Sequence, residues 1–240
     1  MSFMKLLKWC GRRLRSSHWH QKTRLAGVFA LLALATPSSW AADPEVMQLA
    51  RAVDQHYNDL GSLQAEFTEV YRGAGIERSE SGTLWLKKPG KMRWEYRSPR
   101  EKLFLSDGRT AWLYVQGDRQ ARKTAASKLN DVRSPMALLL GKLKLEKELQ
   151  GLSLAPDRAP LTEGDVVLRG VPRGTSDRVS GVLVEIAGGH RIARIVIEEA
   201  DGATTDFRFD GQRENQDMPE SRFRFQAPAG VEVVDGGFNP

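Results

Sequence analysis

The chain has 240 residues with 36 Lys and Arg, 30 Asp and Glu, a single cysteine and a formal net charge of +6. The excess positive charge lies at the N-terminus, where residues 1–24 contain no acidic residue and seven basic ones: Lys5, Lys8, Arg12, Arg13, Arg15, Lys22 and Arg24. Residues 42–240 contain 29 basic and 30 acidic residues, so this part of the chain has no general affinity for nucleic acid.

Residues 1–41 have the pattern of a secretory signal peptide. The basic segment is followed by an apolar run of eleven residues, Leu25–Ala35, and then by the small-x-small sequence Ser39-Trp40-Ala41. The run is too short to span a bilayer as an anchor, and the residues after Arg12-Arg13 fit a twin-arginine signal poorly. We therefore expect Sec-type export to the periplasm, cleavage after residue 41, and one domain over residues 42–240. Cys10 leaves with the signal, so the mature protein has no disulfide, thiol nucleophile or acylated cysteine.

The mature sequence predicts a mainly β fold with two short helices. A helical period over Asp43–Leu60 predicts the first helix, and Ser134-Pro135 followed by an apolar run to Leu140 predicts the second. Strands are predicted at 63–71, 78–88, 91–98, 101–106, 109–116, 119–124, 152–155, 165–171, 179–187, 191–200 and 204–213. About eleven antiparallel strands in one domain predict a single large, strongly curved sheet.

Three glycine turns determine which side chains share a face. At Pro89-Gly90 a two-residue loop would place Met92 beside Trp85, and a three-residue loop would place it beside Leu86. We choose the three-residue loop because it separates apolar from charged side chains. Two-residue turns at Asp107-Gly108 and Gly188-Gly189 predict two further apolar faces. The first consists of Leu103, Leu105, Trp112 and Tyr114, and the second of Val182, Val184, Ile186, Ala193, Ile195 and Ile197.

Residues 81–115 are rich in large apolar side chains and lack a catalytic constellation. We predict a concave apolar surface lined by Leu84, Leu86, Met92, Trp94, Tyr96, Leu103, Leu105, Trp112 and Tyr114. An apolar sheet face is usually ordinary core, but two short helices would cover only part of so long a face, which favours a ligand site or an interface.

An enzyme is not indicated. The mature chain has two histidines, His56 and His190, neither with an evident catalytic partner, and the pair Glu198-Glu199 is typical of solvated strand-edge charge. No ligand spacing predicts a metal site, and no motif predicts a cofactor.

Four sequence features together resemble the periplasmic outer-membrane lipoprotein carrier family (LolA type). They are LQAEF ending at Phe67, SGTLWLKKPGKMRWEY from Ser81, the LFLSDGRTAWLY hairpin and SPMALLL. The resemblance extends over essentially the whole mature chain, is densest over 62–141 and is weak over 142–215. It implies an unclosed β-barrel with a concave apolar surface under a helical lid. It also implies a monomer that receives triacylated lipoproteins from an inner-membrane ABC transporter and passes them to an outer-membrane receptor lipoprotein.

The resemblance also implies a lid and a latch. The family's latch arginine, which bonds to lid carbonyls, corresponds here to Lys88, a point charge without the planar fork of arginine. An ordinary solvated lysine is the alternative for this position. A transporter-docking position falls on Met92, the first-helix contact on Tyr57, and the lid helix on Met136, Leu138, Leu139 and Leu140. Two other functions of such a fold are a carrier of another lipid or glycolipid and a lipid-sensing periplasmic regulator.

Overall fold

The computed structural model describes residues 43–129, 139, 144–173 and 178–236. The helical elements are α1 (Pro44–Asp59), η1 (Ala126–Leu129), α3 (Leu145–Glu148), η2 (Gly188–His190) and η3 (Glu220–Phe223). The strands are β1 (Ser62–Gly73), β2 (Ile76–Lys87), β3 (Lys91–Ser98), β4 (Lys102–Asp107), β5 (Thr110–Val115), β6 (Gln120–Ala125), β7 (Leu149–Leu154), β8 (Val166–Pro172), β9 (Val179–Ala187), β10 (Arg191–Glu199), β11 (Thr204–Glu214) and β12 (Glu232–Asp235). In this part of the chain no helix is long and apolar enough to cross a bilayer.

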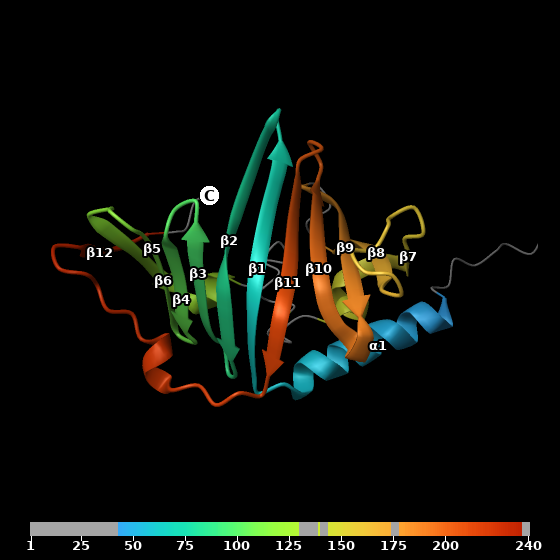
Figure 1. Ribbon diagram of the computed structural model, residues 1–240, viewed down its shortest axis with the longest axis horizontal. Helices are drawn as coiled ribbons and strands as arrows, with labels where there is room; N and C mark the ends of the chain where they lie inside the picture. The colour runs from blue at the N-terminus through green and yellow to red at the C-terminus, as the bar shows by residue number, and fades with distance from the viewer. Residues whose placement is uncertain (1–42, 130–138, 140–143, 174–177, 237–240) are drawn as a thin grey trace, which may run out of the picture. The chain divides into compact units, whose positions relative to one another are not determined.

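All twelve strands form one sheet in the order β12-β6-β5-β4-β3-β2-β1-β11-β10-β9-β8-β7 (Figure 1). Every strand pair is antiparallel except β12 with β6. Strands β12 and β7 are the two edges, so the sheet is unclosed. The predicted mainly β, half-barrel fold is confirmed, and the sheet has one strand, β12, beyond the eleven expected.

Helix α1 forms where the sequence predicts it. Asp43 caps the helix by accepting a hydrogen bond from the Glu45 amide at 2.9 Å, and Pro44 occupies the first turn. The helix buries Val46, Ala50, Val53 and Tyr57. Their spacing of three or four residues places them on one side of the helix. We call the sheet face against which these residues pack the inner face, and the opposite face the outer face.

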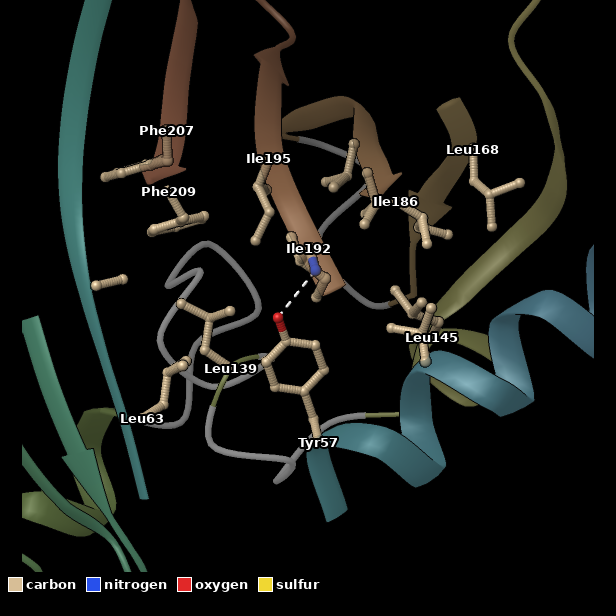
Figure 2. Packing of buried hydrophobic residues seen from close by; sticks show 14 of the residues in the cluster. Tyr57, Leu63, Leu139, Leu145, Leu168, Ile186, Ile192, Ile195, Phe207 and Phe209 are labelled. Carbon is tan, nitrogen blue, oxygen red and sulfur yellow. Dashed lines mark hydrogen bonds between the residues drawn. The ribbon is translucent and has the colours of Figure 1, made fainter. Parts of the chain in front are cut away.

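Two hydrogen bonds attach α1 to its neighbours. The Tyr57 hydroxyl accepts from the backbone N–H of Ile192 at the start of β10, at 2.9 Å (Figure 2). Asp54 accepts from the backbone N–H of Leu145 at the start of α3, also at 2.9 Å. Burial raises the pKa of Asp54, an effect that the Leu145 amide opposes. Figure 1 shows α1 at the end of the sheet where β9 and β10 lie.

The strand register at Pro89-Gly90 confirms the three-residue loop. Lys87 pairs with Lys91, Leu86 with Met92 and Leu84 with Trp94. Directly opposed residues of an antiparallel pair point to the same face, so Leu84 and Trp94 lie together on the inner face.

The other two turns differ from prediction in their loop length. At Asp107-Gly108 the loop is longer by two residues, so Leu105 pairs with Trp112 instead of Thr110. An even shift leaves each side chain on its original face. At Gly188-Gly189 the loop has three residues and a bulge follows between Ile192 and Arg194. The three-residue loop places Ile192 opposite Ile186 in the core in place of the expected Ala193, and the bulge returns Ile195 to the same face opposite Val184.

The outer face of β3–β5 is covered by the chain after β11, residues 216–231, which we call the C-terminal segment. Helix η3 of this segment contacts β3 and β4 and buries Phe223. The Phe225 ring stacks on Trp112 with 5.7 Å between ring centroids. Lys87 donates to the carbonyl of Met218 at 2.6 Å. These contacts hold the C-terminal segment along the sheet until β12 pairs with β6.

Candidate lipid-binding face

The inner face has an aromatic floor centred on Trp94. Trp94 is 2 % exposed, and the centroids of the Phe67, Phe207 and Phe209 rings lie 4.7, 6.3 and 6.4 Å from its own. Gly82 makes this packing possible, because a Cβ there would lie 1.8 Å from the carbonyl oxygen of Glu95 and 2.9 Å from the Phe67 ring. The floor therefore joins β1 and β3 to β11 through aromatic contacts.

The structure divides the nine predicted cavity residues between the two faces. Leu84, Leu86, Met92, Trp94 and Tyr96 lie on the inner face. Leu103, Leu105, Trp112 and Tyr114 share one face as expected, but it is the outer one, because Leu105 pairs with Arg93 while Trp94 pairs with Phe104. The expectation of a single cavity lined by all nine is therefore wrong.

The physical reason is that β4 and β5 are apolar on both faces. On the inner face they present Phe104 and Leu113. On the outer face Leu105 is 0 % exposed and Trp112 meets Phe225. On the outer face Trp112 thus binds the C-terminal segment, and Phe104 and Leu113 are the residues of β4 and β5 on the inner face.

A polar cluster adjoins the aromatic floor. The Tyr96 hydroxyl donates to Glu69 at 3.0 Å, and the Lys102 ammonium donates to Glu80 at 2.6 Å. The Lys102 ammonium also lies 4.0 Å from the centroid of the Tyr96 ring. Burial raises the pKa of Glu69, which the hydrogen bond from Tyr96 opposes, and burial raises the pKa of Tyr96 as well. The inner face thus has a charged and hydroxylic end.

Lys88 contacts the end of α1. Its ammonium donates to the backbone carbonyls of Tyr57 and Asn58 at 2.6 and 2.7 Å. Loss of hydration lowers the pKa of Lys88, which the nearby Asp59 carboxylate opposes. The predicted acceptors were carbonyls near Leu138–Leu140. Both bonds seen here end on the first helix, and residues 138 and 140 lie outside the described residues.

Of the predicted lid helix, Leu139 is the residue that the structure describes. Its side chain is buried and belongs to the same hydrophobic cluster as Trp94. Figure 2 draws Leu139 and Tyr57 among the residues of that cluster. With Leu63, Leu86 and Lys88, Leu139 lines a small open pocket. Met136, Leu138 and Leu140 lie outside the described residues. Leu139 and α1 together cover inner-face residues that would otherwise meet water.

Several residues of this face were absent from the predicted site. Phe67 appeared only as part of a family motif, and Phe207 and Phe209 were given only as part of a strand. Alternation along residues 204–213 placed both on one face, but the sequence gives no indication that β11 pairs with β1 beside Trp94.

The described residues offer little for catalysis. His56, for which no partner was expected, lies 3.1 Å from Glu214. That pair joins the last turn of α1 to the end of β11. Across residues 43–129, 139, 144–173 and 178–236, no group of three or more His, Cys, Asp or Glu could hold a metal ion.

Comparisons with known proteins agree with this architecture. The family model described as outer membrane lipoprotein carrier protein LolA matches residues 58–226. The outer-membrane lipoprotein carrier protein of Chromobacterium violaceum is 29 % identical over 210 residues, covering 87 % of this chain and 98 % of that protein. The protein of the same description from Dechloromonas aromatica is 29 % identical over 221 residues, covering 89 % and 96 %. An uncharacterized conserved protein from Thermus thermophilus shares the fold, with a TM-score of 0.54 at 13 % identity over 80 % of this chain and 99 % of that one. The chain belongs to the LolA family of outer membrane lipoprotein carrier proteins.

Proposed function

We propose that this protein is a periplasmic carrier that shields the acyl chains of lipoproteins between the inner and outer membranes. Family membership supports the carrier role. The observation that carries the proposal is the aromatic floor around Trp94, which belongs to one buried hydrophobic cluster with Leu139 and the apolar side of α1. In this proposal residues 1–41 are a Sec signal that is removed on export.

The energy of acyl-chain exposure explains why such a carrier needs partners. Exposing a chain of about fifteen methylenes to water costs ~12 kcal/mol at ~0.8 kcal/mol each. Three chains cost more than a typical domain gains on folding. The sequence has no G-x-x-x-x-G-K-[ST] phosphate-binding loop. We therefore assign the extraction step to an inner-membrane ABC transporter, and release to an outer-membrane receptor lipoprotein.

Loading requires the covering elements to move. Trp94, Leu84 and Leu86 are each at most 3 % exposed, so an acyl chain cannot reach them while the cover is in place. Lys88 joins the β2–β3 loop to the last turn of α1, and this contact must break for the helix to leave. In the proposed cycle, acyl chains displace α1 and the Lys88 contact re-forms after unloading.

The test is release of lipoproteins from spheroplasts by protein purified from the periplasm. We expect release of triacylated lipoproteins into the soluble fraction, and a purified protein that begins at or near Ala42 on N-terminal sequencing. Mass spectrometry of co-purified lipid identifies the natural cargo. A glycolipid in place of lipoprotein acyl chains, with no lipoprotein release, would overturn the proposed cargo. Retention of residues 1–24 would overturn the proposed processing.

A further inference from the structure

The inner face changes in polarity along its strands. We describe it as three successive levels, each a row of directly paired residues that runs across neighbouring strands. At the first level Leu63, Leu86 and Met92 are paired across β1, β2 and β3, and all three are buried. At the second level Ala65, Leu84, Trp94 and Phe104 are paired in the same way. At the third level Phe67, Gly82, Tyr96 and Lys102 are paired, and Glu69 pairs with Glu80 directly beyond.

This gradient has the polarity of an amphiphile. Across β1, β2 and β3 the first level is apolar, with Ser106 of β4 and Glu214 of β11 paired at its two sides, and it adjoins Leu139 at the α1 end of the strands. The third level adds a hydroxyl and an ammonium, and the two carboxylates follow it. The polarity of a lipid lying along the strands matches that of the face when its hydrocarbon tail occupies the first level and its polar linkage lies near the third.

Trp94 lies between the apolar and polar levels and has an unused donor. Its indole Nε1 is buried and has no hydrogen-bond partner among the residues that the structure describes. Buried N–H groups are nearly always paired, so an orphan at this point calls for an explanation. The neighbouring donors are already engaged, Tyr96 by Glu69 and Lys102 by Glu80.

We propose that the Trp94 indole N–H donates a hydrogen bond to the ester or amide carbonyl at the head of a bound acyl chain. The tail then runs toward Met92, Leu86 and α1, and the polar remainder leaves past Tyr96 and Lys102. The inference rests on the proposed function, and it adds a direction of binding and a preference for carbonyl-linked chains. Trp94 is thus a specificity-determining residue as well as part of an apolar floor.

The test uses ¹H–¹⁵N spectra of the indole groups in protein purified from the periplasm. Methyl laurate and tridecane, two probes of similar length with and without a carbonyl, are delivered from cyclodextrin. The Trp94 signal is identified by its absence from Trp94→Phe. We expect its indole proton to move downfield with methyl laurate and not with tridecane. Trp85 and Trp112, which lie on the outer face, report no such difference.

Direction is tested with spin-labelled stearate methyl esters. A nitroxide at carbon 5 should broaden the Trp94 signal more strongly than a nitroxide at carbon 16. Equal broadening, or the reverse order, would overturn the direction. An equal response of Trp94 to methyl laurate and tridecane would overturn the hydrogen bond and leave the carrier function intact. Absence of any binding by either probe would overturn both proposals.

Trp94→Phe supplies a second measurement, because it keeps an aromatic ring and removes the donor. We expect it to weaken methyl laurate binding roughly 3- to 10-fold more than tridecane binding, the effect of one ordinary hydrogen bond. Trp112→Phe is the matched control and should leave this ratio unchanged. Equal losses for both probes in Trp94→Phe would show that Trp94 contributes area alone and would overturn the inference.

Discussion

Replacing Lys88 by leucine removes an ammonium that donates to the carbonyls of Tyr57 and Asn58. A buried hydrogen bond to a charged group contributes ~1.5–3 kcal/mol, and Lys88 is only partly buried, so each bond contributes less. A cation at a helix C-terminus adds ~0.3–1 kcal/mol. We therefore expect Lys88→Leu to destabilise the docked position of α1 by about 1–2 kcal/mol, which raises the undocked population ~5- to 30-fold.

Hydrogen exchange of backbone amides measures the population of molecules in which α1 is undocked. The Ile192 amide is bonded to the Tyr57 hydroxyl and the Leu60 amide to the His56 carbonyl, so both become exchangeable when the end of α1 moves away. Both amides should exchange ~5- to 30-fold faster in Lys88→Leu. The variant should also bind more of an apolar dye and release less lipoprotein from spheroplasts.

Lys87→Leu is the matched control for Lys88→Leu. Lys87 makes the same kind of bond from the adjacent residue, but to the Met218 carbonyl in the C-terminal segment. Its loss should lower the melting temperature without changing exchange at Ile192. Lys88→Arg should strengthen the contact with the α1 carbonyls through paired N–H donors, so it should slow both amide exchange and acyl-chain loading. Wild-type exchange and release in both Lys88 variants would refute the latch.

Trp94→Ala should weaken binding of an apolar probe, whereas Trp85→Ala, which alters the outer face, should not; equal losses in a probe titration would contradict the face assignment. The stack of Trp112 on Phe225 should give a coupling energy of about 0.5–1.5 kcal/mol in a double-mutant cycle of unfolding, and no change in probe binding. Burial raises the pKa of Glu69 in the folded protein, so the folded state takes up a proton at a higher pH than the unfolded state does. Wild type should therefore gain stability relative to Glu69→Gln as the pH falls through the raised pKa, and the gain should end near pH ~4.3, where the unfolded carboxyl is protonated too. A difference in melting temperature that stayed constant from pH 7 to pH 4 would show that Glu69 is ordinarily hydrated.

The sheet could be predicted closely wherever a strand is polar on one side. Along β2 and β3 the charged residues Lys87, Arg93 and Glu95 alternate with apolar ones, and this alternation was enough to choose the loop at Pro89-Gly90 correctly. Strand β12 was missed because it has four residues and its parallel partner, β6, lies far away in the sequence.

The inner and outer faces of β4 and β5 could not be distinguished from the sequence. Leu103, Phe104 and Leu105 are consecutive and apolar, so alternation does not indicate which face meets the lid. The deciding partners, Phe223 and Phe225, come more than a hundred residues later in the chain. The same limit applies to Lys88, whose position in a loop was predictable but whose acceptors on α1 depend on how the helix docks.

The C-terminal segment also has a consequence for the order in which the fold can be completed. The outer sides of Leu105 and Trp112 are covered by residues near the end of the chain. Because a Sec-exported chain enters the periplasm N-terminus first, β3, β4 and β5 have one apolar face uncovered until those last residues arrive. During that interval the incomplete sheet is prone to aggregation, and chaperones that hold unfolded chains can bind its uncovered apolar face. A truncation before Phe223 should therefore aggregate even though it retains eleven of the twelve strands.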